Sequence, residues 1–190
     1  LQLMHGGRVS HPEITQTGRT VSASSEQLDG FARTKKGKVV PPPPHALTEA
    51  EIATIISEFA QAAKNAIEVG MDGVQLHAAN GYLLHQFFAP SSNKRTDRYG
   101  GSPVKRAQFP IEVTKAVVDA IGADKVGVRL SPQHNVQGAL EPDLEETRAT
   151  YLEYARFAAE ADLAFLDVIY GDPTSKLVAD IRKAFGGPFI

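Results

Sequence analysis

The sequence predicts a parallel α/β fold, and within that class it favours a barrel over an open sheet. Short apolar runs typical of strands alternate with longer amphipathic segments typical of helices, which is the order found in parallel sheets. No GxGxxG or Walker loop follows any of these strands, which weakens the case for an open nucleotide-binding sheet. Polar side chains follow the apolar runs, where barrel enzymes build their active sites.

The first half of the chain is predicted to contain two strands and one helix. In order, the elements are a strand, a long irregular loop, a helix and a strand: 1–4, 5–47, 48–70 and 73–76. The loop is expected to be irregular because it has no clear period and is rich in Gly, Ser, Thr and Pro. Thr48 and Glu51 have the spacing of a capping box, so the helix should begin there, and Gly70 is a natural stop.

The second half continues the alternation. Its predicted elements are a short helix, a loop, a helix, a strand, a turn-rich loop, a helix, a strand, a helix and the start of a strand: 81–88, 89–101, 102–122, 125–130, 131–142, 143–161, 164–169, 172–186 and 188–190. Ser102 and Pro103 suit the N-cap and first position of a helix, and Asp172 with Pro173 should start the last one. About five strands result, two of them incomplete, whereas a closed barrel needs eight.

Composition limits the kind of protein. At 190 residues, with 42% hydrophobic and 22% charged residues, one globular domain is expected. The net charge of −2 argues against nucleic acid and anionic membranes as partners. Cysteine is absent, which excludes disulfides and iron–sulfur ligation within these residues. No apolar run approaches the roughly 18 residues of a membrane span. The chain starts at Leu1 and resembles an internal piece of a longer, cytoplasmic protein.

Three polar side chains follow the strand at 73–76. His77 stands at its end, with Asn80 and Tyr82 three and five residues further on. Each alone has a structural explanation: a hydrogen-bonded histidine, an Asn-Gly turn and an aromatic anchor. Together they can do more, since two donors close together can polarise one oxygen atom of a ligand and a nearby phenol can supply a proton.

Two further polar residues lie on apolar strands. Arg129 is the one charged residue in VGVRL, and a cation on a barrel's inner face needs either an ion-pair partner on a neighbouring strand or an anionic ligand. Gln2 lies in LQLM, where its amide can hydrogen-bond a heterocycle edge or a buried protein group. For both residues the two alternatives stay open.

Other kinds of chemistry find little support. His5 and His11 are six residues apart, and His77 and His85 are eight apart, without a third partner at metal-ligand spacing, so we expect no metal site. No GxSxG motif is present. A lyase or aldolase barrel would need a Schiff-base lysine or a metal at a strand end, and neither is apparent.

Several separated stretches resemble one family, the Old Yellow Enzymes. They are QLMHGGRVSHP, HAANGYLLHQFFAPSSNKRTDRYGGS, VGVRLSP and DVIYGDP, at residues 2–12, 77–102, 126–132 and 167–173. The second is the most specific, because it is similar to the family's substrate-binding signature. The resemblance covers essentially the whole chain. Met4 departs from it, since many members have an aromatic residue there.

The resemblance implies an FMN-dependent ene-reductase. Residues 1–190 would be part of an FMN-binding (β/α)8 barrel, roughly strands 3 to 7, with the N- and C-terminal parts missing. NAD(P)H would reduce FMN, which would pass hydride to the activated C=C of an α,β-unsaturated carbonyl or nitro compound. His77 and Asn80 would bind the substrate oxygen and Tyr82 would donate the proton. By the same resemblance, Gln2 and Arg129 would contact the flavin.

The alternative is a truncated, non-catalytic barrel fragment that binds no flavin, as the missing strands suggest. The natural substrate, the choice between NADH and NADPH and the oligomeric state are left open.

Overall fold

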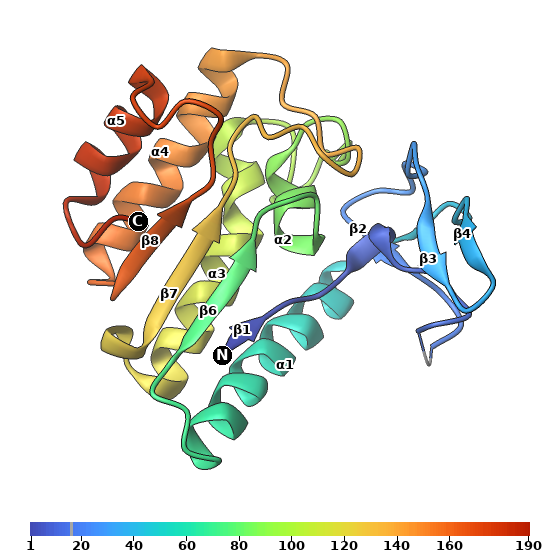
Figure 1. The fold of residues 1–190 in the computed structure, drawn as a ribbon, viewed down its shortest axis with the longest axis horizontal. Helices are drawn as coiled ribbons and strands as arrows, with labels where there is room; N and C mark the ends of the chain where they lie inside the picture. The colour runs from blue at the N-terminus through green and yellow to red at the C-terminus, as the bar shows by residue number, and fades with distance from the viewer. Residues whose placement is uncertain (16) are drawn as a thin grey trace.

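The centre of the molecule is a four-stranded parallel sheet. The structure, a computed structural model, describes residues 1–15 and 17–190. The strand order is β1-β6-β7-β8 (Figure 1), and the strands are Gln2–Leu3, Val74–Ala78, Val126–Leu130 and Phe165–Val168. A parallel bridge between Leu166 and Phe189 begins the next strand, as the sequence predicts for 188–190.

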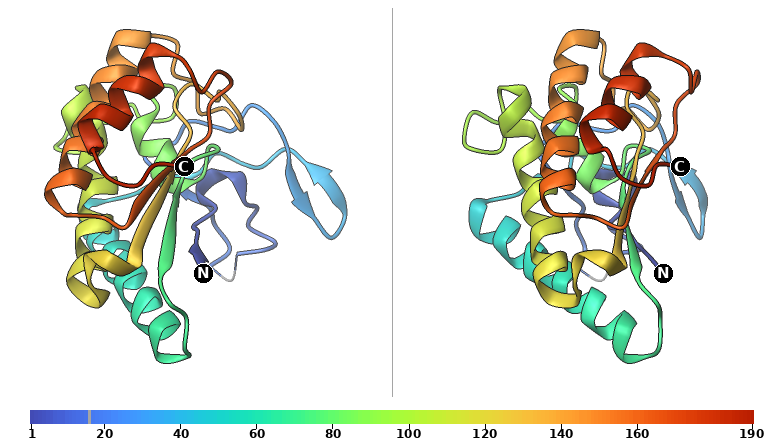
Figure 2. Two further views of the ribbon diagram at one scale, coloured as in Figure 1. Left: turned by 60° about the vertical axis from the view of Figure 1, so that its left-hand side comes forward. Right: turned by 90° about the vertical axis from the view of Figure 1, so that its left-hand side faces the viewer.

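Helices cover one face of this sheet. They are α1, α3, α4 and α5, at Glu49–Glu68, Pro103–Ile121, Leu144–Glu160 and Lys176–Phe185. The side views show them on the same side of the strands, and no described helix covers the other face (Figure 2). The short helix α2, Leu83–Phe88, lies beyond the end of β6 (Figure 1). This one-sided βα arrangement is that of a barrel wall, whose uncovered face is the barrel interior.

Along each strand, side chains alternate between the face that the helices cover and the uncovered inner face. Successive strand side chains point to opposite faces. Leu76, Val128 and Leu166 are fully buried beneath the helices. On the inner face, Gly127 lies beside Phe165, and a Cβ added to Gly127 would lie 2.2 Å from the Phe165 ring. The glycine therefore makes room for an aromatic side chain on the neighbouring strand.

The predicted helix starts are confirmed for α1 and α3. Thr48 and Glu51 form the complete capping box, and the Ser102 hydroxyl accepts a hydrogen bond from the Lys105 N–H. The predicted start of the last helix is wrong, because α5 begins at Lys176 and is capped by Ser175. Asp172 instead forms a turn of its own.

The segment 5–47 is more ordered than its sequence suggests. It contains a 3-10 turn, a parallel pair, β2 with β5, and an antiparallel hairpin of β3 and β4; these elements are Gly7–Val9, Val21–Ser22, His45–Ala46, Ala32–Thr34 and Gly37–Val39. The hairpin projects from the body of the molecule (Figure 1). The strands have two or three residues each, too few for a clear period-two pattern.

Candidate active site

The strand register brings two predicted site residues, His77 and Arg129, together with Asp167 at one end of the sheet. His77 on β6 is paired with Arg129 on β7, and Arg129 is paired with Asp167 on β8. Paired residues of parallel strands point to the same face, so all three side chains belong to the uncovered inner face. The carboxyl ends of barrel strands are where active sites lie.

His77 is buried and incompletely satisfied. Its side chain is 5% exposed, and its Nδ1 atom has no hydrogen-bond partner among residues 1–15 and 17–190. Burial, with contributions from Arg129 and His85, lowers the pKa of His77. The imidazole is therefore neutral near pH 7, and a neutral ring has one donor and one acceptor nitrogen.

Asn80 and Tyr82 complete the segment 77–82, called the strand-end turn below. Asn80 has a φ of 56°, a left-handed conformation that asparagine tolerates better than most residues. The Tyr82 ring lies against that of His77, with ring centroids 5.0 Å apart. Neither the Asn80 amide nor the Tyr82 hydroxyl takes part in the side-chain hydrogen bonds of the described residues. The structure thus brings His77 and Tyr82 into contact and leaves polar groups of the turn available.

Gln2 and Arg129 belong to a different arrangement, the polar row of Gln2, Gln75, Asp167 and Arg129. Gln2 Nε2 donates to Gln75 Oε1 over 2.7 Å, and Gln75 Nε2 donates to Asp167 Oδ2 over 2.9 Å. Arg129 Nε donates to the same Asp167 oxygen, and Nη2 lies 2.6 Å from it. Of the two alternatives for Arg129, an ion pair with a neighbouring strand is therefore present. Its side chain is still 36% exposed, so part of the guanidinium remains accessible.

The sequence analysis missed two members of the polar row. Asp167 is the one charged residue of the strand FLDV, the same signal that singled out Arg129. Gln75 alternates with His77 in VQLHA, so both point to one face. A search for polar residues on apolar strands would have found both.

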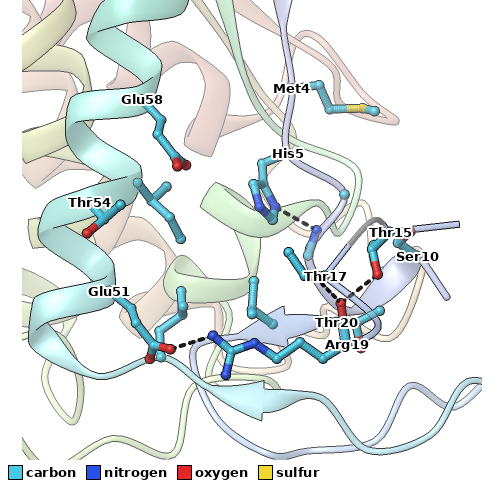
Figure 3. Close-up of a pocket in the computed structure, with 15 residues that line it drawn as sticks. Met4, His5, Ser10, Thr15, Thr17, Arg19, Thr20, Glu51, Thr54 and Glu58 are labelled. Carbon is cyan, nitrogen blue, oxygen red and sulfur yellow. Dashed lines mark hydrogen bonds and ion pairs between the residues drawn. The ribbon is translucent and has the colours of Figure 1, made fainter. Parts of the chain in front are cut away.

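A separate cavity lies between α1 and the loop that follows β1. It has a volume of about 440 Å³ and is bounded by this loop and α1, with Arg19 and Glu51 forming an ion pair at its edge (Figure 3). His5 and Glu58 also line it. None of the five predicted site residues does, so the cavity is distinct from the predicted site.

The fold agrees with comparisons to known proteins. The model of the NADH:flavin oxidoreductase / NADH oxidase family matches residues 1–173. The chain belongs to this family. Its structural relatives include an Old Yellow Enzyme homologue from Zymomonas mobilis, 34% identical with a TM-score of 0.91, which confirms the predicted Old Yellow Enzyme resemblance and the partial barrel.

Several similar proteins are named as reductases. An aldehyde reductase, FrzD, of a Cladobotryum species is 51% identical over 73% of this chain and 35% of its own length. A probable flavin mononucleotide-dependent alkene reductase of Leishmania infantum is 41% identical over 90% of this chain and 48% of its own. Morphinone reductase in complex with tetrahydroNAD has a TM-score of 0.88 and 34% identity, over 100% of this chain and 53% of that one. The chain thus spans about half the length of these relatives.

The inner face suits the flavin that the family name implies. It presents one accessible guanidinium and one exposed glutamine amide, which are groups that can hydrogen-bond ring carbonyls and nitrogens. Residues 1–15 and 17–190 hold no cluster of three or more His, Cys, Asp or Glu side chains suited to a metal ion. Within the same residues, no helix has the length and apolar character to cross a membrane.

Proposed function

We propose that this chain carries the substrate-binding wall of an FMN-dependent NAD(P)H ene-reductase acting on α,β-unsaturated carbonyl or nitro compounds. The observation that supports it most is the strand-end turn, where a buried neutral His77 with an unpartnered Nδ1 contacts Tyr82, in a chain of the flavin oxidoreductase family. Relatives named alkene reductase and aldehyde reductase support an alkene next to a carbonyl group as the substrate.

The chain's own residues would divide the work. Bound FMN, once reduced by NAD(P)H, supplies a hydride for the alkene β-carbon. His77 and Asn80 donate hydrogen bonds to the carbonyl or nitro oxygen, polarising the double bond and stabilising the negative charge that develops there. Tyr82 delivers a proton from its hydroxyl to the α-carbon. Arg129 and Gln2 hold the flavin ring, with the guanidinium favouring its anionic reduced form.

The polar row supports this role for Arg129. Asp167 fixes the guanidinium through Nε and Nη2, which leaves Nη1 without a partner in the described part of the chain. An arginine that is held on one side and accessible on the other is well placed to meet an anionic ring.

Stopped-flow absorbance of the FMN-loaded protein tests the proposal. We expect NADPH to bleach the flavin and an enone such as cyclohexenone to restore its colour. A protein that takes up FMN but is not reoxidised by any enone or nitroalkene would contradict the ene-reductase assignment.

The competing hypothesis is a barrel fragment that binds no flavin. Its support is that the described sheet has four strands and that β1 pairs on one side only, with β6. Titration of the 190-residue chain with FMN, followed by flavin fluorescence, distinguishes the two: micromolar binding with turnover excludes the inert fragment.

A further inference from the structure

The strand-end turn is bound to a second loop, residues 131–143, which follows β7. The Asn80 N–H donates to Ser131 Oγ over 2.7 Å, and Gln137 Nε2 donates to the Asn80 carbonyl over 2.6 Å. Gly81 has no room for a side chain, because a Cβ there would lie 2.7 Å from Gln137 Cβ. The two segments therefore hold each other closely.

Both segments contain unfavourable backbone conformations. Asn80 in the turn has a φ of 56°, and Gln133, Asn135 and Gln137 in the loop have φ values of 52°, 52° and 54°. Residues other than glycine seldom adopt this region, and they do so when surrounding contacts enforce it. Four such residues in two segments that hydrogen-bond each other imply that contacts between the turn and the loop enforce these conformations.

His85, on α2, holds the turn through a hydrogen bond to its backbone. Its side chain is fully buried, and its Nδ1 accepts a hydrogen bond from the Gly81 N–H over 2.8 Å. Since Nδ1 is the acceptor, the proton of a neutral ring is on Nε2. Nε2 has no hydrogen-bond partner among the described residues, and the acceptor that it faces is Glu141 Oε1, 3.5 Å away.

Glu141 is hydrogen-bonded to two other residues of the loop. Its side chain is 2% exposed, and Oε2 accepts a hydrogen bond from the Gln133 N–H over 2.6 Å. Its own N–H donates to Asn135 Oδ1 over 2.9 Å. Two of the three left-handed loop residues are thus bound by this one residue. Burial and the Glu141 carboxylate together raise the pKa of Tyr151, so its phenol stays protonated beside the carboxylate.

The contact between His85 and Glu141 has an unusual composition for one that serves only stability. Glutamate is seldom fully buried, and no lysine or arginine pairs with Glu141 in the described part of the chain. An apolar pair of similar volume is often at least as stable as a buried ionisable one. Directional groups at this position indicate a need for fixed geometry.

We propose that His85 and Glu141 form a buried positioning pair that locks the strand-end turn to the loop 131–143 and so orients Asn80 and Tyr82 toward the substrate. This inference rests on the proposed function, because that function gives the two side chains their task. Neither His85 nor Glu141 touches the substrate in this scheme; both act through the turn.

Two conservative variants disrupt the contact between His85 and Glu141 while changing the surrounding packing little. His85→Asn keeps an acceptor for the Gly81 N–H but removes Nε2. Glu141→Gln keeps the size of the side chain but leaves one acceptor oxygen for two donors. Tyr154→Phe is the matched control, since it removes a buried hydrogen bond of 2.6 Å to Thr114 without touching the turn or the loop.

Amide hydrogen exchange of the chain, followed residue by residue by NMR, tests the pair without any flavin. We expect each variant to speed exchange at Gly81 and Tyr82 by roughly tenfold, the effect of losing one hydrogen bond, while α1 amides keep their rates. The double variant should change no more than the larger single one, because both remove the same link. Unchanged turn amides, equal changes in α1, or additive effects would each overturn the proposal.

Kinetics of the FMN-loaded protein give the second readout. Reoxidation by an enone should slow by roughly 10- to 100-fold in both variants, because small misplacements of reacting groups are costly, whereas flavin reduction by NADPH should match the wild type and Tyr154→Phe. Enone reoxidation at the wild-type rate would overturn the positioning role. A wild-type protein inactive toward enones would instead refute the proposed function, and the exchange experiment would still decide whether the pair fixes the turn.

Discussion

The polar row and the strand-end turn lie side by side on the same sheet, yet they treat their polar groups in opposite ways. In the row, Asp167 Oδ2 accepts hydrogen bonds from both Arg129 and Gln75. In the turn, His77 Nδ1 is buried without a partner in the described residues, and it touches Tyr82 only through the rings. The carboxylate of the row is satisfied by protein donors, whereas the buried imidazole nitrogen of the turn is not.

This difference separates Asp167, which positions its neighbours in the row, from His77, which we propose meets the substrate. A buried polar atom without a partner costs about 1–3 kcal/mol of stability. Such a cost is tolerated at a functional site when binding supplies the missing partner. Changes in the turn should therefore affect reaction rates more than folding, and changes in the row should do the reverse.

The largest effect is expected for Tyr82→Phe. The ring and its contact with His77 remain, while the hydroxyl that donates the proton is lost. We expect enone-dependent reoxidation of the flavin to slow by about 10²–10⁴-fold, measured by stopped flow, with flavin reduction by NADPH unchanged. Tyr154→Phe removes a phenol hydroxyl elsewhere and should behave as wild type. An unchanged rate in Tyr82→Phe would mean that another acid, or water, delivers the proton.

Removal of an oxygen-binding donor should have the next largest effect. His77→Ala and Asn80→Asp each remove a donor, and aspartate suits the left-handed backbone at position 80. We expect enone-dependent reoxidation to fall by about 10²–10³-fold with a raised enone Kd, both from stopped-flow titrations. If flavin reduction were lost instead, the turn would be holding the flavin and the comparison with the row would fail.

Asp167→Asn probes the row. Loss of its charge should lower the free energy of unfolding by about 1–3 kcal/mol, because two donors lose a charged acceptor. His77→Phe should leave that free energy unchanged or raise it, since a buried unpartnered nitrogen is removed. Urea unfolding monitored by circular dichroism measures both.

The control for Asp167→Asn is Asp119→Asn. Asp119 forms an exposed pair with Lys115 on one helix, and such pairs contribute at most about 1 kcal/mol. A turn variant more destabilising than Asp167→Asn would reverse the proposed division of labour.

The smallest effect concerns the start of α1, far from both regions. Hydrogen bonds from Thr48 and His45 lower the pKa of Glu51 to about 2. A depressed folded-state pKa gives stability that is present above the unfolded value, about 4.3, and is lost as the pH falls toward 2. Thr48→Ala should remove about 1 kcal/mol at pH 7 and weaken this acid dependence only slightly in urea titrations, because the backbone N–H of residue 48 still donates to the Glu51 carboxylate.

Thr54→Ala is the matched control, because within residues 1–15 and 17–190 its hydroxyl bonds only to the helix carbonyl of Ala50, and the residue is exposed. Its unfolding free energy should stay close to the wild-type value at every pH. Equal pH profiles for Thr48→Ala and the wild type would show that the Thr48 hydroxyl does not contribute to the lowered pKa of Glu51.

Local signals explain which parts of the fold could be predicted from the sequence. Thr48 with Glu51, and Ser102 with Pro103, cap helices through residues three or fewer positions apart, so the sequence contains the whole interaction. The start of α5 was misplaced because Asp172 and Ser175 are both good caps, and the Asp172 carboxylate bonds Thr174 instead. Within 5–47, β2 and β5 could not be predicted because they pair across a long stretch of chain, and β3 and β4 because three residues each are too few for a clear period.

The candidate site divides in the same way. His77, Asn80 and Tyr82 come from one junction, so their proximity follows from the chain itself, and their catalytic roles stay predictions. The partners of Arg129 and His85 could not be predicted, since Asp167 and Glu141 lie 38 and 56 residues away and meet them only through strand register and loop folding. Register is a tertiary property that a single sequence does not state.

The packing of Phe165 beside Gly127 places an aromatic ring on the inner face of the sheet. These residues precede Asp167 and Arg129 by two positions, one layer further from the carboxyl ends of the strands. Any side chain larger than hydrogen at position 127 would have to displace this ring. The single hydrogen atom of Gly127 is therefore what allows an aromatic ring next to the layer of Arg129 and Asp167.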